Sequence, residues 1–192
     1  MNPGISRIAL CLLVIAPLAS VARANEPTPA GAIVPIDYLV LPAVGQYGRL
    51  PLQRDAVESQ LVAGTWKEPT PGATLKTADG KLSMWNSVKA GDDGTLDTQK
   101  IRGGYAFATF DSPDERVMLL EATGHAMVYV NGGPHTGDPY GVDWLHLPVL
   151  IKKGKNTLLF HLGADKLKAR LIPPPEKPIF IAAHDHTLPT LI

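Results

Sequence analysis

The sequence predicts an all-β fold, an antiparallel β-sandwich with one short helix, behind an N-terminal signal peptide. From residue 104 onward, short apolar runs recur about every 8–12 residues, which is the spacing of strands in a sandwich or barrel. Polar turns separate these runs, and the chain contains 18 Gly and 18 Pro. Helical periodicity occurs in one segment, which leaves no room for the alternating helices of a parallel α/β sheet.

Residues 1–24 have the layout of a secretory signal peptide. Arg7 precedes an apolar run over residues 8–21, and Ala22-Arg23-Ala24 has the pattern of a cleavage site. Because the apolar run is too short for a comfortable membrane span, we expect a secreted or periplasmic protein without a stable span after cleavage. An uncleaved anchor is the alternative interpretation.

Removal of the signal changes the composition. The mature chain would have 192 − 24 = 168 residues, no Cys, and 18 − 2 = 16 basic against 18 acidic residues, a net charge of −2. Without a basic surface field there is no electrostatic case for a nucleic-acid partner, and without Cys there is no thiol catalysis. The expected division is a signal peptide over 1–24, a linker over 25–36, one sandwich domain over 37–173, and a Pro-rich linker with the start of a truncated second domain over 174–192.

The expected elements follow from local patterns. Residues 38–41 form the first expected strand, and residues 50–64 the helix, with Pro51 at its first position and Gly64 at the C′ position. Residues 65–98 are expected to be a loop-rich stretch. The later strands are expected at residues 105–110, 116–121, 126–130, 144–151, 157–162, 167–172 and 179–183. The dipeptide Asn131-Gly132 predicts a hairpin turn.

Several segments together resemble the galactose-binding-like jelly-roll module found at the front of large secreted bacterial hydrolases. These segments are residues 38–42, 93–97, 128–132, 137–141, 147–149, 153–156 and 158–160. The resemblance implies a jelly-roll sandwich over about residues 37–173. In the larger relatives an α/β-hydrolase or prolyl-oligopeptidase-like domain lies downstream, so the resemblance also implies a catalytic domain as a partner.

One Gly/Pro-rich loop, residues 131–146, gathers the side chains of a candidate binding site. They are His135, Asp138, Tyr140, Asp143, Trp144 and His146. Loops carried on a rigid sandwich commonly hold binding sites. Aromatic rings stack on the apolar face of a sugar while carboxylates and imidazoles bond its hydroxyls, so this loop predicts a glycan site. The alternative is that the aromatic side chains pack beneath the loop.

Two further clusters have metal-like spacing. Asp92, Asp93 and Asp97 surround Gly94, and such an acidic Gly turn is common, so we expect no cofactor; a structural calcium, which jelly-roll modules often hold, is the alternative. On a strand, His184 and His186 would share one face as two zinc ligands. Zinc needs a third protein ligand, and no spacing nominates one, so we favour a polar strand end over a zinc site.

No catalytic residue is predicted. The serines of the mature chain are Ser59, Ser83, Ser87 and Ser112, and none lies in a G-x-S-x-G motif. The leading hypothesis is a secreted, non-catalytic accessory module that binds a glycan and forms the front part of a larger hydrolase. The alternatives are an interaction domain that docks on a downstream domain, a metal enzyme using His184 and His186, and a serine hydrolase or peptidase whose catalytic domain is missing here.

Overall fold

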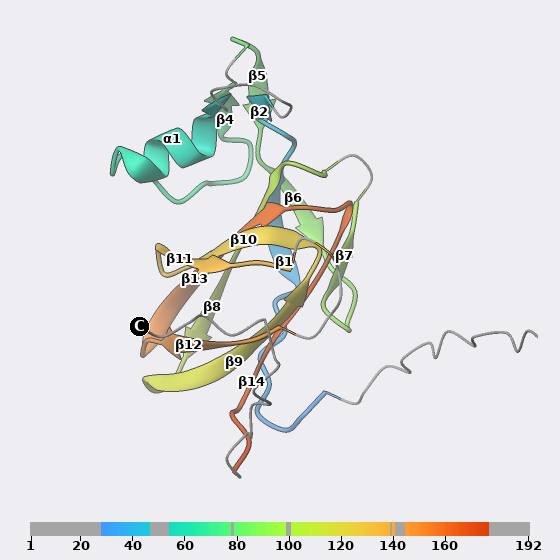
Figure 1. The fold of residues 1–192 in the computed structure, drawn as a ribbon, viewed down its shortest axis with the longest axis vertical. Coiled ribbons are helices and arrows are strands. Elements are labelled where there is room, and N and C mark those ends of the chain that lie inside the picture. The colour runs from blue at the N-terminus through green and yellow to red at the C-terminus, as the bar shows by residue number, and fades with distance from the viewer. Residues whose placement is uncertain are drawn as a thin grey trace, which may run out of the picture.

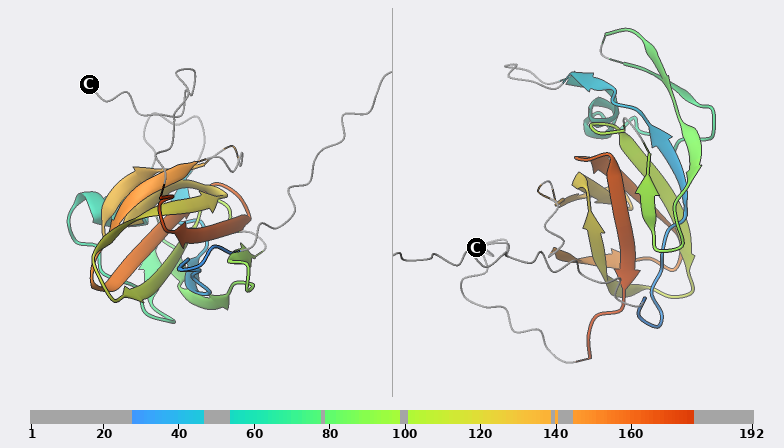
Figure 2. Two further views of the ribbon diagram at one scale, coloured as in Figure 1. Left: turned by 90° about the horizontal axis from the view of Figure 1, so that it is seen from below. Right: turned by 90° about the vertical axis from the view of Figure 1, so that its right-hand side faces the viewer.

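The computed structural model describes residues 28–46, 54–77, 79–98, 101–138, 140 and 145–176. Two antiparallel β-sheets pack face to face in this part of the chain, as Figure 1 shows and the right-hand view of Figure 2 shows edge-on. The predicted fold class, an antiparallel sandwich with one short helix, is confirmed. The expected signal at 1–24 and the expected strand at 179–183 lie outside the described residues.

The larger sheet has six strands and the smaller sheet has four. The order in the six-stranded sheet is β11-β10-β13-β8-β1-β6, with bounds Gly133–Thr136, His125–Val130, Gly154–Leu162, Tyr105–Ser112, Asp37–Leu41 and Asn86–Lys89. The order in the four-stranded sheet is β12-β9-β14-β7, with bounds His146–Ile151, Arg116–Thr123, Lys166–Ile172 and Thr95–Asp97. From β7 to β14 the chain crosses repeatedly between the two sheets, which is the connectivity typical of a double-sheet jelly roll.

The main core lies between the two sheets and follows the two-residue period of the strands. Along β9, Met118, Leu120 and Ala122 point inward, and along β13 the inward residues include Leu158 and Phe160. All five are nearly inaccessible to solvent. Burying a large apolar side chain stabilises the fold by about 1.5–3 kcal/mol relative to exposure, so this alternation fixes which face of each strand turns inward.

A second core covers the outer face of the six-stranded sheet. We call it the outer core; it consists of Leu41, Val44, Val57, Trp85, Tyr105, Phe107 and Leu159. The covering layer is made by α1 (Ala56–Val62) and four short strands, β2 (Gly45–Gln46), β3 (Arg54–Asp55), β4 (Thr74–Lys76) and β5 (Leu82–Met84). Figure 1 shows α1, β2, β4 and β5 gathered at one end of the sandwich. The six-stranded sheet is therefore covered on its outer face at that end.

The helix is shorter than the sequence predicts. Asp55 caps it, since its Oδ1 accepts hydrogen bonds from the backbone N–H groups of Val57 (2.8 Å) and Glu58 (2.9 Å). The predicted start at residue 50 is wrong, because Arg54–Asp55 pairs as a strand with Gly45–Gln46 before the helix begins. The predicted C′ role of Gly64 is confirmed by its φ of 67°. Among the described residues, no helix is long and apolar enough to cross a membrane.

The loop-rich stretch over 65–98 also contains four short strands that the prediction did not place, β4, β5, β6 and β7. Each of these strands has only three or four residues, too few to show an alternating pattern. The hairpin turn at Asn131-Gly132 is confirmed, with φ of 51° and 85°, and it joins β10 to β11, a strand absent from our prediction. The expected strand at 144–151 begins at His146 in the described chain.

Candidate functional site

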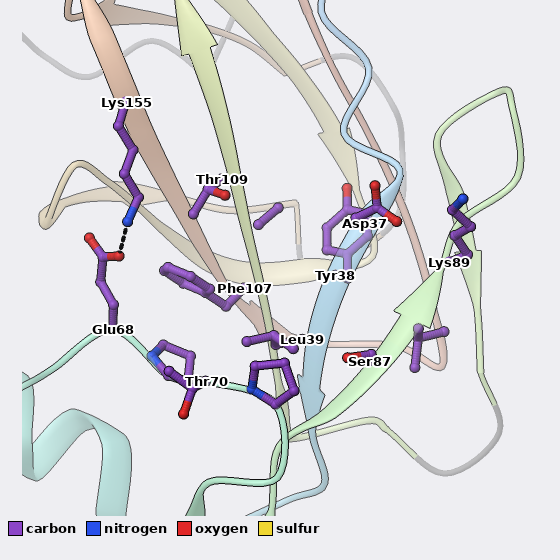
Figure 3. Close-up of a pocket in the computed structure, with 14 residues that line it drawn as sticks. Asp37, Tyr38, Leu39, Glu68, Thr70, Ser87, Lys89, Phe107, Thr109 and Lys155 are labelled. Carbon is purple, nitrogen blue, oxygen red and sulfur yellow. Dashed lines mark hydrogen bonds and ion pairs between the residues drawn. The ribbon is translucent and has the colours of Figure 1, made fainter.

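A groove of about 840 Å³ opens on the outer face of the six-stranded sheet. Figure 3 shows its lining side chains, which come from β1, β6, β8, β13 and from the segment that links α1 to β4. We call it the outer groove; it is lined by Asp37, Tyr38, Leu39, Glu68, Pro69, Thr70, Pro71, Ser87, Val88, Lys89, Phe107, Ala108, Thr109 and Lys155. It adjoins the outer core, since Phe107 and Leu39 contribute to both.

The floor of the groove is apolar. Leu39 and Phe107 are direct partners in the β1–β8 pair, so their side chains lie next to each other on the outer face. Phe107 is 5% exposed, which holds its ring rigidly in the floor. One wall is the segment Glu68–Pro71, whose two prolines limit the backbone freedom of that wall.

The rim of the groove is polar. Thr109 and Ser87 are exposed on β8 and β6 and offer hydroxyl groups. Lys155 Nζ forms an ion pair with Glu68 at one side of the groove, which ties the wall to β13. This tie joins residues 87 positions apart in the sequence. The arrangement can hold a ligand that presents an apolar face to the floor and hydroxyl or amide groups to the rim.

The structure distributes the residues of the predicted loop site over different surfaces. His135 lies on β11 opposite the inward-pointing Val128, so its side chain is on the inner face of the six-stranded sheet. His146 lies on β12 in the other sheet, where its Nε2 is 3.4 Å from Glu121 Oε1. Tyr140 is 88% exposed. The two histidines therefore face different surroundings. Asp143 and Trp144 lie outside the described residues.

Asp138 lies at the buried base of the same loop. It is only 4% exposed, and its carboxylate interacts electrostatically with His125, which is 1% exposed. Burial lowers the pKa of His125 to about 4, and Asp138 opposes part of that shift. Gly137 packs against β10 so closely that an added Cβ would lie 2.3 Å from the carbonyl carbon of Ala126. In this structure the base of the loop is part of the sandwich interior.

The predicted calcium residues are engaged in local contacts. Asp93 Oδ1 accepts from the backbone N–H of Thr95 (3.0 Å) and Oδ2 from its hydroxyl (2.8 Å), and these bonds lower the pKa of Asp93. Asp97 pairs with Lys166 at 2.7 Å, and Asp92 is exposed. Within the described ranges no group of three or more His, Cys, Asp or Glu side chains is arranged to hold a metal ion. The calcium site remains a prediction, and His184 and His186 lie outside those ranges.

Sequence reasoning missed the outer groove, although one signal pointed to it. The run Tyr105–Phe110 carries apolar or small residues on both faces of its strand, including Phe107 on the outer face. A strand that is apolar on both faces is covered on both faces, which indicates a further layer outside the sandwich. The groove is formed where that further layer ends.

Comparisons of the chain with protein-family models, with curated proteins and with solved structures give no significant match.

Proposed function

We propose that the chain is a non-catalytic β-sandwich accessory module that binds carbohydrate in the outer groove. The observation that carries this proposal is the combination of an apolar floor, Leu39 and Phe107, with a polar rim on a rigid sheet. A pyranose ring has the same two-sided character, because its C–H groups form an apolar face and its hydroxyls lie around the edge.

The rim supplies the hydrogen-bonding groups that sugar hydroxyls need. Asp37 and Glu68 offer carboxylate acceptors, while Lys89 and Lys155 offer ammonium donors. Thr109 adds a hydroxyl that both donates and accepts. Because these groups stand on strands or on the proline-bordered wall, little ordering of the backbone is needed on binding.

The non-catalytic part of the proposal is supported by two of the four described serines, Ser59 and Ser112. Ser112 is 3% exposed and donates its hydroxyl to the carbonyl oxygen of Asp114 (2.8 Å). Ser59 donates to the carbonyl oxygen of Asp55 (2.6 Å). A nucleophilic serine needs an adjacent base and an exposed hydroxyl on a sharp turn, and these two hydroxyls are used in backbone contacts.

Glycan-array binding of the purified chain, followed by calorimetry on the best ligands, tests the proposal. Thr109→Trp places a bulky ring at an exposed position of the groove and should abolish binding without unfolding the chain. Tyr140→Ala, at the tip of the other candidate loop, should leave the affinity within twofold. The reverse pattern would move the site to the loop, and a folded chain that binds no glycan on the array would refute the proposal.

The same proposal includes export and membership of a larger hydrolase. Export is supported by the signal-like layout of residues 1–24, and the larger hydrolase by the resemblance of residues 37–173. Reading the gene beyond codon 192 tests the second part: a continuous frame with a G-x-S-x-G motif supports it, and a stop codon opposes it.

A second candidate function, docking on another domain without a small ligand, is favoured by one apolar pair. Val117 and Leu150 are direct partners on β9 and β12, and they are 49% and 54% exposed. Adjacent exposed apolar side chains on a sheet face are typical of interaction surfaces. If the chain binds no glycan and Val117→Lys improves its solubility and keeps it monomeric, this second function gains support.

A further inference from the structure

The charges at one side of the outer groove neutralise each other. Glu68 and Lys155 form an ion pair, and their side chains are 47% and 57% exposed. Figure 3 shows this pair on one side of the apolar floor. A ligand gains little from either charge here, because each is already compensated by its neighbour.

The opposite side of the groove carries a second pair of opposite charges that are not bonded to each other. Asp37 and Lys89 are direct Cα partners in the β1–β6 pair, and both side chains are exposed. In the described part of the chain no ion pair joins either of them to another residue. Figure 3 shows both beyond Leu39, on the side away from Lys155. A carboxylate acceptor and an ammonium donor therefore stand side by side, available to a ligand.

The four charged groups of the groove sum to zero. Two carboxylates, Asp37 and Glu68, oppose two ammonium groups, Lys89 and Lys155. A charged ligand entering such a groove would lose hydration without a net field of opposite sign to compensate the loss. An uncharged polyhydroxy ligand avoids that cost. It can also donate one hydroxyl to Asp37 and accept from Lys89, and hydrogen bonds to ionised groups are stronger than neutral ones.

We infer that the ligand is an electrically neutral saccharide and that Asp37 and Lys89 determine this specificity. The inference rests on the proposed carbohydrate binding and adds the class of sugar and the pair of residues that selects it. In this arrangement Leu39 and Phe107 contact the apolar face of the sugar ring, and Asp37 and Lys89 bind two of its hydroxyls.

Calorimetry on matched oligosaccharides of equal length tests the inference. The neutral series are oligomers of galactose, glucose and mannose, and the acidic series are the corresponding uronic acid oligomers. Chitosan oligomers supply a cationic series. The wild-type chain should bind at least one neutral series about tenfold or more tightly than its acidic and cationic counterparts.

Two variants, each of which removes one charge, test whether Asp37 and Lys89 determine the selectivity. Asp37→Asn gives the groove a net charge of +1, and Lys89→Met gives it −1. Each should weaken neutral-sugar binding about tenfold or more, as expected for losing a hydrogen bond to a charged group. Asp37→Asn should also improve uronate binding relative to neutral sugar, whereas Lys89→Met should improve chitosan binding relative to neutral sugar.

Matched controls lie on the other sheet. Asp97→Asn, on β7, and Lys166→Met, on β14, make the same charge changes on the four-stranded sheet at exposed residues that do not line the groove, and they should leave every affinity within twofold. Equal binding of neutral and acidic sugars, or tighter binding of uronates, would overturn the inference and leave carbohydrate binding intact. Selectivity that both variants preserve would also overturn it. If the folded chain binds none of the series, the proposed function fails and the inference fails with it.

Discussion

The buried side chain of Asn156 provides the sharpest test of how the sandwich is held together. It lies near the start of β13, beside the turn that follows β12, and is 0% exposed. Its Oδ1 accepts hydrogen bonds from Asn131 Nδ2 and the Lys152 N–H, both at 2.9 Å, and its Nδ2 donates to the carbonyl oxygens of Lys152 (2.8 Å) and Gly154 (2.9 Å). Asn131 Oδ1 in turn accepts from the Thr157 N–H (3.0 Å), so the two amides tie together two hairpin turns.

The expected loss for Asn156→Ala follows from this count. Each hydrogen bond contributes about 1 kcal/mol net, so four of them set an upper value of about 4 kcal/mol. Water can reach some of the freed backbone groups, since Lys152 and Lys153 at the turn are exposed. The variant should therefore lose about 2–4 kcal/mol of unfolding free energy, and its Tm should fall by roughly 5–15 °C for a domain of this size.

Urea unfolding followed by tryptophan fluorescence measures this loss. Trp85 is buried in the outer core and Trp66 packs edge-on against it, with 6.2 Å between ring centroids, so unfolding changes their surroundings. The control is Asn86→Ala, which removes one hydrogen bond from an exposed side chain to the Met84 carbonyl. A loss for Asn156→Ala no larger than that of Asn86→Ala would refute the reasoning.

Three further predictions concern capping, packing and pH. Asp55→Ala should cost about 1 kcal/mol of stability because it removes the cap of α1, whereas Asp55→Asn should cost less; thermal unfolding compares the two. Gly124→Ala should prevent stable folding, because the added Cβ would lie 1.9 Å from the carbonyl oxygen of Lys166. In Gly132→Ala the added Cβ meets nothing within 4 Å, so this variant should lose only the unfolding free energy that a positive φ costs a non-glycine residue, about 1–2 kcal/mol. Burial lowers the pKa of His125 from 6.5 to about 4, so between these pH values the unfolded chain binds a proton that the folded chain does not. Stability should then fall as the pH falls through that window, by at most about 1.4 kcal/mol per pH unit, and His125→Gln should flatten the slope measured by urea unfolding.

Each of these has a clear contrary result. Equal melting temperatures for both Asp55 variants would show that the carboxylate does not act as a cap. A Gly124→Ala protein as stable as Gly132→Ala would contradict the close approach to Lys166. An unchanged pH slope in His125→Gln would assign the acid sensitivity to other groups.

The long strands were predictable from the sequence because their alternation is strong. In β9, for example, the inward residues Met118 and Leu120 are separated by one outward position. The turn after β10 was also predictable, because Asn and Gly are the residues that adopt a positive φ most readily, as Asn131 and Gly132 do here. The short strands were not predictable. A strand such as β7, Thr95–Asp97, is fixed by its register with Lys166–Lys168, seventy residues later, rather than by a pattern of its own.

The outer groove could not be predicted from the spacing of residues in the sequence, because five separate segments build it. Asp37, Glu68, Lys89 and Lys155 become neighbours of one groove only after the strand order β13-β8-β1-β6 is set and the segment after α1 is laid over the sheet. The sequence favoured the loop at 131–146 as the binding site because its polar and aromatic residues are close in sequence. Closeness in sequence did not bring His135 and His146 to one surface, since they belong to different sheets.

The position of the groove follows from where the outer core stops. At one end of the six-stranded sheet, Tyr105 and Leu159 are covered by the outer layer; farther along the same strands, Thr109 and Lys155 are exposed. The wall that divides these regions is held on one side by the packing of Trp66 and on the other by the Glu68–Lys155 ion pair. A ligand that binds only when this wall is in place would stabilise the outer layer by mass action. Loosening that layer would weaken binding only as far as it lowers the fraction of chains whose wall is in place, because the apparent Kd varies inversely with that fraction.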